Sequence, residues 1–144
     1  MFSKACEYAI RATIYIGQQS NKNAKVNLKE VAQAIESPVA FTGKILQSLV
    51  KEGIILSTKG VSGGYTIDLS TTDNLTLLRI VKAIDGDTIY NSCGLGLDYC
   101  DENEPCPLHN EFVVIRKKLQ HMLSETTIES LNLNFPKNTY FLKR

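Results

Sequence analysis

Apolar residues recur at helical spacing along most of this chain. In the first segment Ala5, Tyr8, Ala12 and Ile16 lie three or four positions apart, which predicts an amphipathic helix over residues 3–19. Similar patterns, with capping residues at their starts and glycine at two of their ends, predict the remaining helices. They span residues 27–35, 37–52, 76–85 and 108–123, and a short helical turn follows at 127–131.

Two short segments between the third and fourth helices predict strands. One is the apolar run at residues 54–57, and the other alternates apolar and polar residues over 65–69. The connection from Thr58 to Gly64 contains three glycines, which favours a flexible hairpin. The predicted fold class is α+β, with much more helix than strand.

The order helix, tight turn, helix and glycine-rich hairpin within residues 27–69 predicts a winged helix-turn-helix domain. The second helix of such a unit enters a DNA major groove about 12 Å wide, and the hairpin reaches the adjacent backbone or minor groove. The predicted contacts lie at the start of this helix and along the hairpin. They are Ser37, Val39, Ala40, Phe41, Thr42, Gly43, Lys44, Ser57, Lys59, Gly60, Gly63, Gly64 and Tyr65.

These residues also have a structural interpretation. Many small α/β domains contain two short helices and a hairpin. Phe41 and Tyr65 suit a core position as well as a contact, and Lys44 and Lys59 can be solvated surface lysines. From topology alone, both interpretations stand.

Composition excludes several other classes of protein. With 144 residues, 43% of them hydrophobic and 22% charged, the chain has the size and balance of one globular domain. No apolar run approaches the roughly 18 residues of a membrane span, and no signal-peptide pattern is present. We therefore expect a cytoplasmic protein without a membrane partner. The absence of a Ser-His-Asp pattern and of a phosphate-binding glycine loop argues against an enzyme.

Charge and cysteine are unevenly distributed. The net charge is +1, made up of +3 over residues 1–70 and −2 over residues 71–144. Residues 85–111 contain seven acidic side chains, no lysine or arginine, and three of the four cysteines. Long irregular loops of this kind are often functional. Cys6, outside the loop, is predicted to be a small buried residue.

The loop offers a set of soft ligands. Cys93, Cys100, Cys106 and His109 supply three thiols and an imidazole, which suit zinc or an iron–sulfur cluster. The alternatives are a structural zinc site, free redox-active thiols and a site that has lost its metal.

Four motifs resemble the bacterial regulator family that includes IscR, NsrR and CymR, and the similarity covers about residues 1–131. They are Tyr-Ala-Ile-Arg-Ala at residues 8–12, Phe-Thr-Gly-Lys-Ile-Leu-Gln-Ser-Leu at 41–49, Gly-Ile-Ile-Leu-Ser-Thr-Lys-Gly-Val-Ser-Gly-Gly-Tyr at 53–65 and Leu-Leu-Arg-Ile-Val-Lys-Ala-Ile-Asp-Gly at 77–86. The resemblance implies a homodimeric transcription factor that binds double-stranded DNA at a near-palindrome. It also implies that the helix at 108–123 crosses the partner subunit. Gly43 and Lys44 depart from the family pattern, so a base preference does not transfer.

The resemblance further implies a cluster at the cysteine loop. Three cysteines are typical of the iron–sulfur members, His109 matches the histidine of the IscR-like branch, and Glu7 matches an acidic ligand that NsrR-like relatives offer from the partner. We expect a [2Fe–2S] cluster in preference to [4Fe–4S], with zinc as the alternative cofactor.

The expected organisation has three parts: a winged helix-turn-helix domain at 1–75, a linker helix, sensor loop and dimerisation helix at 76–131, and a polar tail at 132–144. The expected function is a regulator whose operator affinity responds to the loop. The alternative is a cluster-free or zinc-bound protein that regulates through thiol redox state or docks on another protein.

Overall fold

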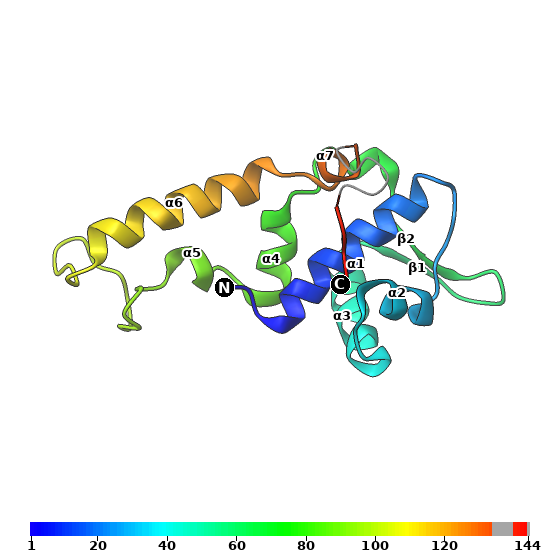
Figure 1. Ribbon diagram of the computed structural model, residues 1–144, viewed down its shortest axis with the longest axis horizontal. Coiled ribbons are helices and arrows are strands. Elements are labelled where there is room, and N and C mark those ends of the chain that lie inside the picture. Colours follow the sequence, from blue (N-terminus) through cyan, green and yellow to red (C-terminus); the bar gives the residue numbers. More distant parts are fainter. Residues whose placement is uncertain (134–139, 144) are drawn as a thin grey trace.

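A computed structural model describes residues 1–133 and 140–143 of the chain (Figure 1). It confirms the predicted fold class, because the described residues are mostly helical with one two-stranded sheet in a winged helix-turn-helix arrangement. Residues 134–139 and 144 of the predicted tail lie outside the described residues. No helix in the described part of the chain is long and apolar enough to cross a membrane.

Three helices form the amino-terminal part of the fold, which we call the head. They are α1 (Lys4–Ser20), α2 (Leu28–Ile35) and α3 (Val39–Lys51). Ser3 caps α1 by accepting a hydrogen bond from the amide of Cys6. Asn27 and Glu30 form the predicted capping box at α2, and Glu36, in the left-handed conformation (φ 51°), ends that helix. The turn from α2 to α3 is consequently short.

A hairpin completes the head. Strands β1 (Leu56–Thr58) and β2 (Gly64–Thr66) pair antiparallel, with Ser57 opposite Tyr65. The amide of Tyr65 donates to the carbonyl of Val26 at 2.7 Å, and the amide of Val26 donates back at 3.2 Å. The hairpin is therefore bonded to the segment that precedes α2. A short 3-10 helix, η1 (Leu69–Thr71), follows.

The main core lies inside the head, around α1. Its largest fully buried side chains include Ile16, Ile35, Leu46, Leu49 and Ile55. Residues from later in the chain complete it, since Leu75, Ile80 and Ile128 are also fully or almost fully buried there.

The second part of the fold, which we call the arm, extends away from the head (Figure 1). It comprises α4 (Leu77–Asp85), α5 (Thr88–Asn91) and α6 (His109–Glu125), and α7 (Ile128–Leu133) returns to the head. The expectation of an entirely irregular loop over residues 85–111 was wrong in one respect, because α5 forms within it. Its turn closes when the amides of Asn91 and Ser92 donate to Asp87 and Thr88.

Candidate nucleic-acid interface and thiol loop

Helix α3 has one buried and one exposed face. Thr42, Ile45, Leu46 and Leu49 are buried against the core. Val39, Ala40, Lys44, Gln47 and Ser48 are exposed on the opposite side. Gln47 was not predicted as a contact, although its position three residues after Lys44 places it on the same face. A glutamine on a recognition helix can bond an adenine edge through two hydrogen bonds.

One predicted contact residue at the start of α3 was assigned wrongly, and the residue before the helix stays a prediction. Thr42 is fully buried, and its hydroxyl donates to the carbonyl of Pro38 at 2.9 Å. The hydroxyl of Ser37 forms a hydrogen bond with that same Thr42 oxygen. Ser37 is half-buried, and its oxygen can still accept a hydrogen bond from a base, so its contact with DNA stays a prediction.

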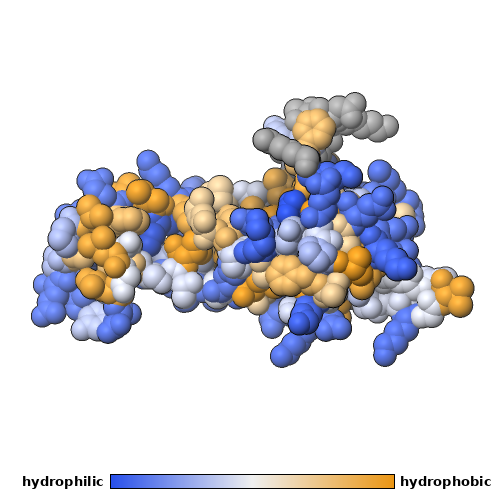
Figure 2. Space-filling view, turned by 60° about the horizontal axis from the view of Figure 1, so that its bottom comes forward, coloured by the Kyte–Doolittle hydropathy of each residue, from blue (hydrophilic) through white to orange (hydrophobic). Residues whose placement is uncertain are grey.

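The hairpin, or wing, carries the second group of predicted contacts. Ser57, Lys59 and Gly60 are exposed, and Val61 between the two strands is entirely so. Figure 2 shows apolar atoms at the end of the molecule where the wing lies. Gly63 differs from the prediction, because its amide donates to the carbonyl of Gly60 at 3.0 Å inside the loop. A Cβ at Gly63 would lie 2.1 Å from the Thr58 carbonyl oxygen, so the loop accepts no side chain there. Gly64 lies in β2 at the base of the wing.

The two aromatic candidates have different surroundings. Tyr65 is half-buried and packs against the main core. Phe41 is 36% exposed in the first turn of α3, where its ring meets that of Tyr8 edge-on at 5.8 Å. Of the pair, Phe41 is the one placed to contact a ligand.

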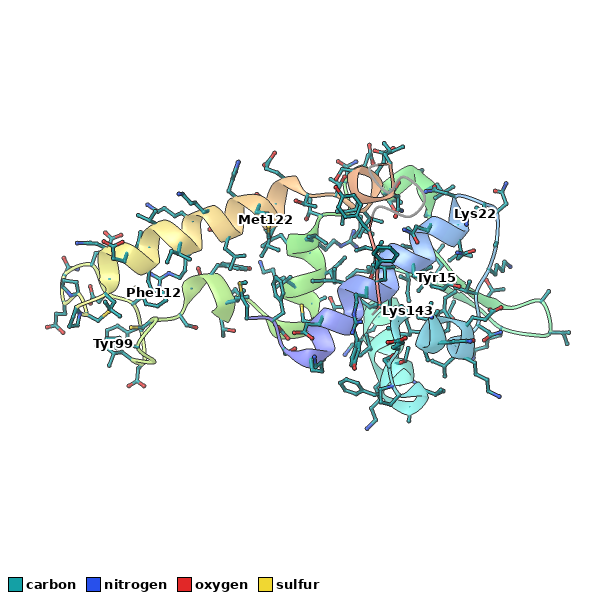
Figure 3. All side chains as sticks on the ribbon, viewed as in Figure 1. Tyr15, Lys22, Tyr99, Phe112, Met122 and Lys143 are labelled. Carbon is teal, nitrogen blue, oxygen red and sulfur yellow. The ribbon has the colours of Figure 1, made fainter. Side chains whose placement is uncertain are left out.

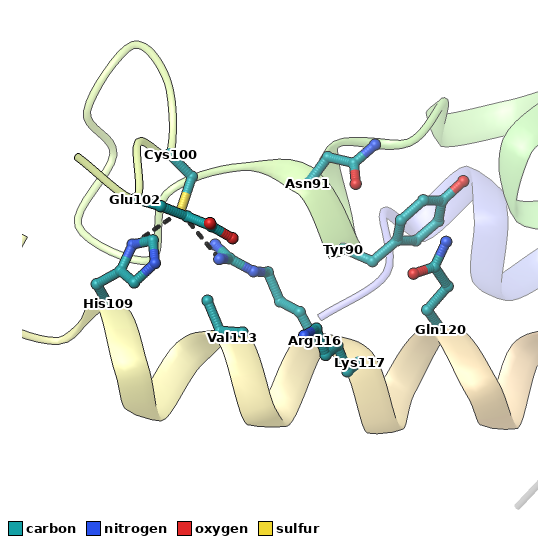
Figure 4. Close-up of a pocket in the computed structure, with 9 residues that line it drawn as sticks. All are labelled: Tyr90, Asn91, Cys100, Glu102, His109, Val113, Arg116, Lys117 and Gln120. Carbon is teal, nitrogen blue, oxygen red and sulfur yellow. Dashed lines mark hydrogen bonds between the residues drawn. The ribbon is translucent and has the colours of Figure 1, made fainter. Parts of the chain in front are cut away.

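The four predicted ligands of the cysteine loop lie in two pairs. The sulfur atoms of Cys93 and Cys106 are 3.7 Å apart. The sulfur of Cys100 lies 3.3 Å from Nδ1 of His109, at the first residue of α6 (Figure 4). Among the described residues, no three His, Cys, Asp or Glu side chains are grouped closely enough to hold one metal ion. The structure therefore brings the four predicted ligands together as two separate pairs and not as one centre.

An arginine that the sequence reasoning missed joins the loop to α6. Arg116 Nη2 donates to the sulfur of Cys100 at 3.0 Å (Figure 4). Nη1 of the same guanidinium donates to the carbonyl of Ser92. The side chains of Arg116 and Cys100 border an open pocket of about 590 Å³. Arg116 brings a positive charge to a loop that has no basic residue of its own.

Hydrogen bonds also favour the thiolate of Cys93. The amides of Leu95 and Leu97 bond to its sulfur and hold the pKa of Cys93 below its ordinary value, with smaller contributions from Cys106 and Arg116. Phe112 of α6 packs on this part of the loop, since a Cβ at Gly94 would lie 2.5 Å from its ring (Figure 3). The loop is thus attached to α6 at several points.

The donor chemistry and the distance within each pair fit a thiophilic metal. Two sulfur ligands of a tetrahedral ion with bonds of about 2.3 Å lie about 3.8 Å apart. The sulfurs of Cys93 and Cys106 are 3.7 Å apart, which is close to that separation. A [2Fe–2S] cluster needs two ligands on each of two irons, and histidines can replace cysteines there. Two pairs, one of them containing a histidine, match that requirement in kind.

The alternative ligand Glu7 and the fourth cysteine, Cys6, both lie on α1. Glu7 forms an ion pair with Lys4 at 2.7 Å, and its proposed role as a ligand to the partner's site stays a prediction. Cys6 is fully buried, and burial together with the nearby Asp85 raises its pKa to about 12. A thiol in such surroundings suits packing better than ligation.

Helix α6 leaves apolar side chains uncovered. Phe112, Ile115, Leu119 and Met122 form an apolar stripe along the helix. Phe112 and Leu119 are half-buried, while Ile115 and Met122 are 57% and 45% exposed. Val114, next to the stripe, is 52% exposed.

Comparison with known proteins supplies the family. Residues 2–133 match the family model described as Rrf2, iron-dependent transcriptional regulator. The chain belongs to the Rrf2 family. It is 26% identical over 136 residues to the regulator NsrR of Oceanobacillus iheyensis, covering 91% of this chain and 88% of that protein. Such Rrf2 relatives are transcriptional regulators and not enzymes, as predicted.

Solved structures share the Rrf2 fold. The structure of CymR, the global cysteine regulator of B. subtilis, matches with a TM-score of 0.74 and 21% identity, covering 92% of this chain and 96% of that one. T. potens IscR matches with a TM-score of 0.75 and 16% identity, covering 97% and 91%. The predicted resemblance to this family is confirmed.

Proposed function

We propose that this Rrf2 protein is a cytoplasmic homodimer that binds a near-palindromic operator, with α3 in the major groove and the wing on the adjacent backbone. The observation that carries the proposal is the exposed face of α3 beside a wing that projects lysine and glycine into solvent. Family membership supports it.

The exposed residues have distinct roles in this proposal. Val39 and Ala40 contact thymine methyl groups, Lys44 reaches guanine or phosphate, and Gln47 reads adenine. Ser57, Lys59 and the backbone near Gly60 bind phosphates, which fixes the position of the head on the duplex without reading sequence. Phe41 supplies apolar contact at the start of α3.

The exposed apolar residues of α6 support the dimer. A second copy of α6 would cover Val114, Ile115 and Met122, which the chain leaves in water. Dimers of such heads read half-sites about 34 Å apart, one helical turn of DNA. The geometry between the two heads then depends on how each is attached to its α6.

Contacts through α4 connect the cysteine loop at residues 85–111 to the head. Arg116 fixes the loop to α6, and α6 packs on α4. From α4, Arg79 Nη2 donates to the carbonyls of Glu52 and Gly53 at 3.3 Å, at the carboxyl end of α3. A basic group there also interacts favourably with the helix dipole.

We propose that Cys93, Cys100, Cys106 and His109 hold an iron–sulfur cluster, [2Fe–2S] before [4Fe–4S]. When bound, the group supplies a covalent tie across the loop whose charge changes with its redox state. The chain's own residues would transmit this change. A loop that changes conformation when its ligands bind the group would move Ser92 and Cys100 relative to Arg116. A coupling of about 1–3 kcal/mol would change operator affinity about 5- to 150-fold.

Thiol chemistry without metal is the second candidate, and the closeness of Cys93 and Cys106 favours it. Hydrogen peroxide could take two electrons and two protons from this pair, leaving a disulfide and water. Zinc held by the same residues is the third form. Intact mass and metal analysis of protein purified without oxygen separate the three forms.

Selection of duplexes from a random-sequence library tests the DNA proposal. We expect the wild type to enrich a near-palindrome and to bind it less tightly as salt rises. Lys59→Gln should reduce the slope of log affinity against log salt by about 0.9 for each phosphate that the lysine neutralises. Lys118→Gln, an exposed lysine of the arm, is the matched control and should leave the slope unchanged. If no sequence is enriched, or if the affinity for DNA does not change with salt, the result would favour docking on a protein instead.

Anaerobic reconstitution with iron and sulfide tests the cluster. We expect visible absorption in the wild type that is absent from Cys93→Ala. Absorption that persists in that variant would contradict the ligand assignment.

A further inference from the structure

The carboxyl-terminal segment Tyr140–Lys143 returns to the head and lies against α1 (Figure 1). Arg11 Nη1 of α1 donates a hydrogen bond to the carbonyl of Leu142 at 3.0 Å, although 131 positions separate the two residues. The half-buried side chain of Leu142 packs against the main core. The match to the Rrf2 family ends at residue 133, so this contact lies outside the part of the chain that the family model describes.

Arg11 is also the first member of a row of contacts that ends on α3. Its guanidinium carbon lies 4.7 Å from the centre of the Tyr8 ring, a cation–π arrangement. The Tyr8 ring meets Phe41 at an interplanar angle of 80°, the edge-on geometry that aromatic pairs favour. The carboxyl-terminal segment is therefore connected to the start of α3 through two side chains of α1.

Phe41 has space beside it in which to move. An open pocket with an empty volume of about 490 Å³ lies between α1, α3 and α4, and Phe41 forms one of its walls. The other walls are Ala5, Lys44, Ile45, Ser48, Ala83 and Ile84. Without Tyr8 to hold it, the ring can turn into this pocket and withdraw from the exposed face. Phe41 therefore has the Tyr8 ring as a contact from α1 and an open pocket beside it.

We propose that Leu142 anchors a carboxyl-terminal clamp that acts through Arg11 and Tyr8 to hold Phe41 at the start of α3 and so raises affinity for DNA. The effect on DNA rests on the proposed function, whereas the contact itself does not. Arg11, Tyr8 and Leu142 are positioning residues, and Phe41 is the residue that meets the DNA. Each contact in the row is of a kind that changes an equilibrium constant about three- to tenfold.

The contact is tested first without DNA, on the full chain. Leucine methyl groups labelled with carbon-13 report on Leu142 by NMR, and the aromatic spectrum reports on Phe41. We expect Arg11→Gln to shift both the Leu142 methyl and the Phe41 ring signals, and Arg11→Lys to restore part of the shift because a cation remains. Phe141→Ala, at a neighbouring side chain 71% exposed, should leave the Phe41 signals in place. If Arg11→Gln leaves both signals unmoved, the clamp is disproved.

The consequence is tested on the duplex that the wild type selects from the random library. Arg11→Gln and Leu142→Asp should each weaken binding about three- to tenfold, and the double variant should be no weaker than the weaker-binding single variant, because both break the same row. Arg11→Lys should recover most of the affinity. Thermal unfolding of Arg11→Gln near the wild-type temperature shows that the head is folded, so the result does not depend on Leu142→Asp.

Two outcomes overturn the proposal in different ways. If Lys143→Gln lowers the salt slope and accounts for the weaker binding of Leu142→Asp, the segment contacts phosphate itself and is not a clamp. If the wild type selects no duplex, the proposed function fails together with the effect on DNA, and the NMR result alone decides whether the segment positions Phe41.

Discussion

Helices α1 and α6 are equally long, at 17 residues each, but the chain covers them very differently. Eight residues of α1 are buried, compared with two of α6, His109 and Leu123. Isolated helices of this length are marginal in water, so most of their stability must come from packing of the apolar face. The head supplies that packing for α1 from its own chain. The arm does not do so for α6, which is the difference that the proposed dimer would remove.

The largest effect is expected from a charge on the uncovered face of α6. Ile115→Asp should convert the proposed dimer to monomers, because Ile115 is 57% exposed in the single chain and would be covered by the partner. Loss of the second head should reduce operator affinity by about 10²- to 10⁴-fold. Analytical ultracentrifugation measures the first effect and titration of the selected duplex the second.

Gln120→Asp on the same helix is the control, since Gln120 is exposed and polar. It should leave both the assembly and the affinity unchanged. A dimeric Ile115→Asp variant would show that α6 does not carry the interface.

Truncation of a buried side chain should lower the free energy of unfolding more in the head than in the arm. Leu46→Ala should lower the free energy of unfolding by about 2–5 kcal/mol, because the fully buried side chain leaves a cavity in the head. Leu119→Ala, at a half-buried position on α6, should cost less than half as much in the monomeric Ile115→Asp background. Urea unfolding measures both, and equal losses would contradict the contrast between head and arm.

The contact between the regions should depend on pH through Cys6, which packs with Val81, Tyr90 and Leu123. Its pKa rises from 9.0 to about 12 in the folded chain, so the folded state binds the thiol proton more tightly than the unfolded state. The resulting stability is fully present below about pH 9 and is lost as the pH rises toward 12.

In the wild type this loss amounts to at most about 1.4 kcal/mol per pH unit above pH 9. Urea unfolding at about pH 8, 9 and 10 should show a shallower decline for Cys6→Ala than for the wild type, with Cys106→Ala as the reference. Parallel declines in all three proteins would remove Cys6 as the cause.

The smallest expected effect, that of a substitution at Gly43, distinguishes the stability of the head from its binding to DNA. A Cβ at Gly43 would meet only Leu28, at an ordinary 3.5 Å, so Gly43→Ala should stabilise α3 by about 0.5–1 kcal/mol. If DNA approaches this side of α3 closely, the same variant should bind the selected duplex less tightly. Higher stability with unchanged binding would show that no DNA passes near Gly43.

Much of the head could be predicted from sequence, because periodicity, caps and turn residues are local signals. The Asn27 capping box and the glycine-rich wing both follow from neighbouring residues. Thr42 was misassigned although the same periodicity places it on the face of Ile45, Leu46 and Leu49. A hydroxyl was taken as a sign of contact where the helical spacing indicated burial.

The arm and the candidate site were less predictable, since their contacts join distant parts of the chain. The spacing of the cysteines gives a ligand set but not the separation into Cys93–Cys106 and Cys100–His109. Arg116 reaches Cys100 from 16 positions away, and Arg11 reaches Leu142 from 131. No periodic pattern encodes such pairs, and the four residues of α5 are too few to produce one.

Two backbone hydrogen bonds between Val26 and Tyr65 join the wing to the helix-turn-helix, and we expect the two to move as one piece. A shift of α4 would therefore re-aim the entire piece and leave the side chains that face the bases in the same arrangement. In a dimer, two heads that have moved in this way would bind half-sites separated by a different number of base pairs. The preferred bases within each half-site would stay the same. In the proposed function, the arm therefore sets the spacing between half-sites and the head sets the base preference within each half-site.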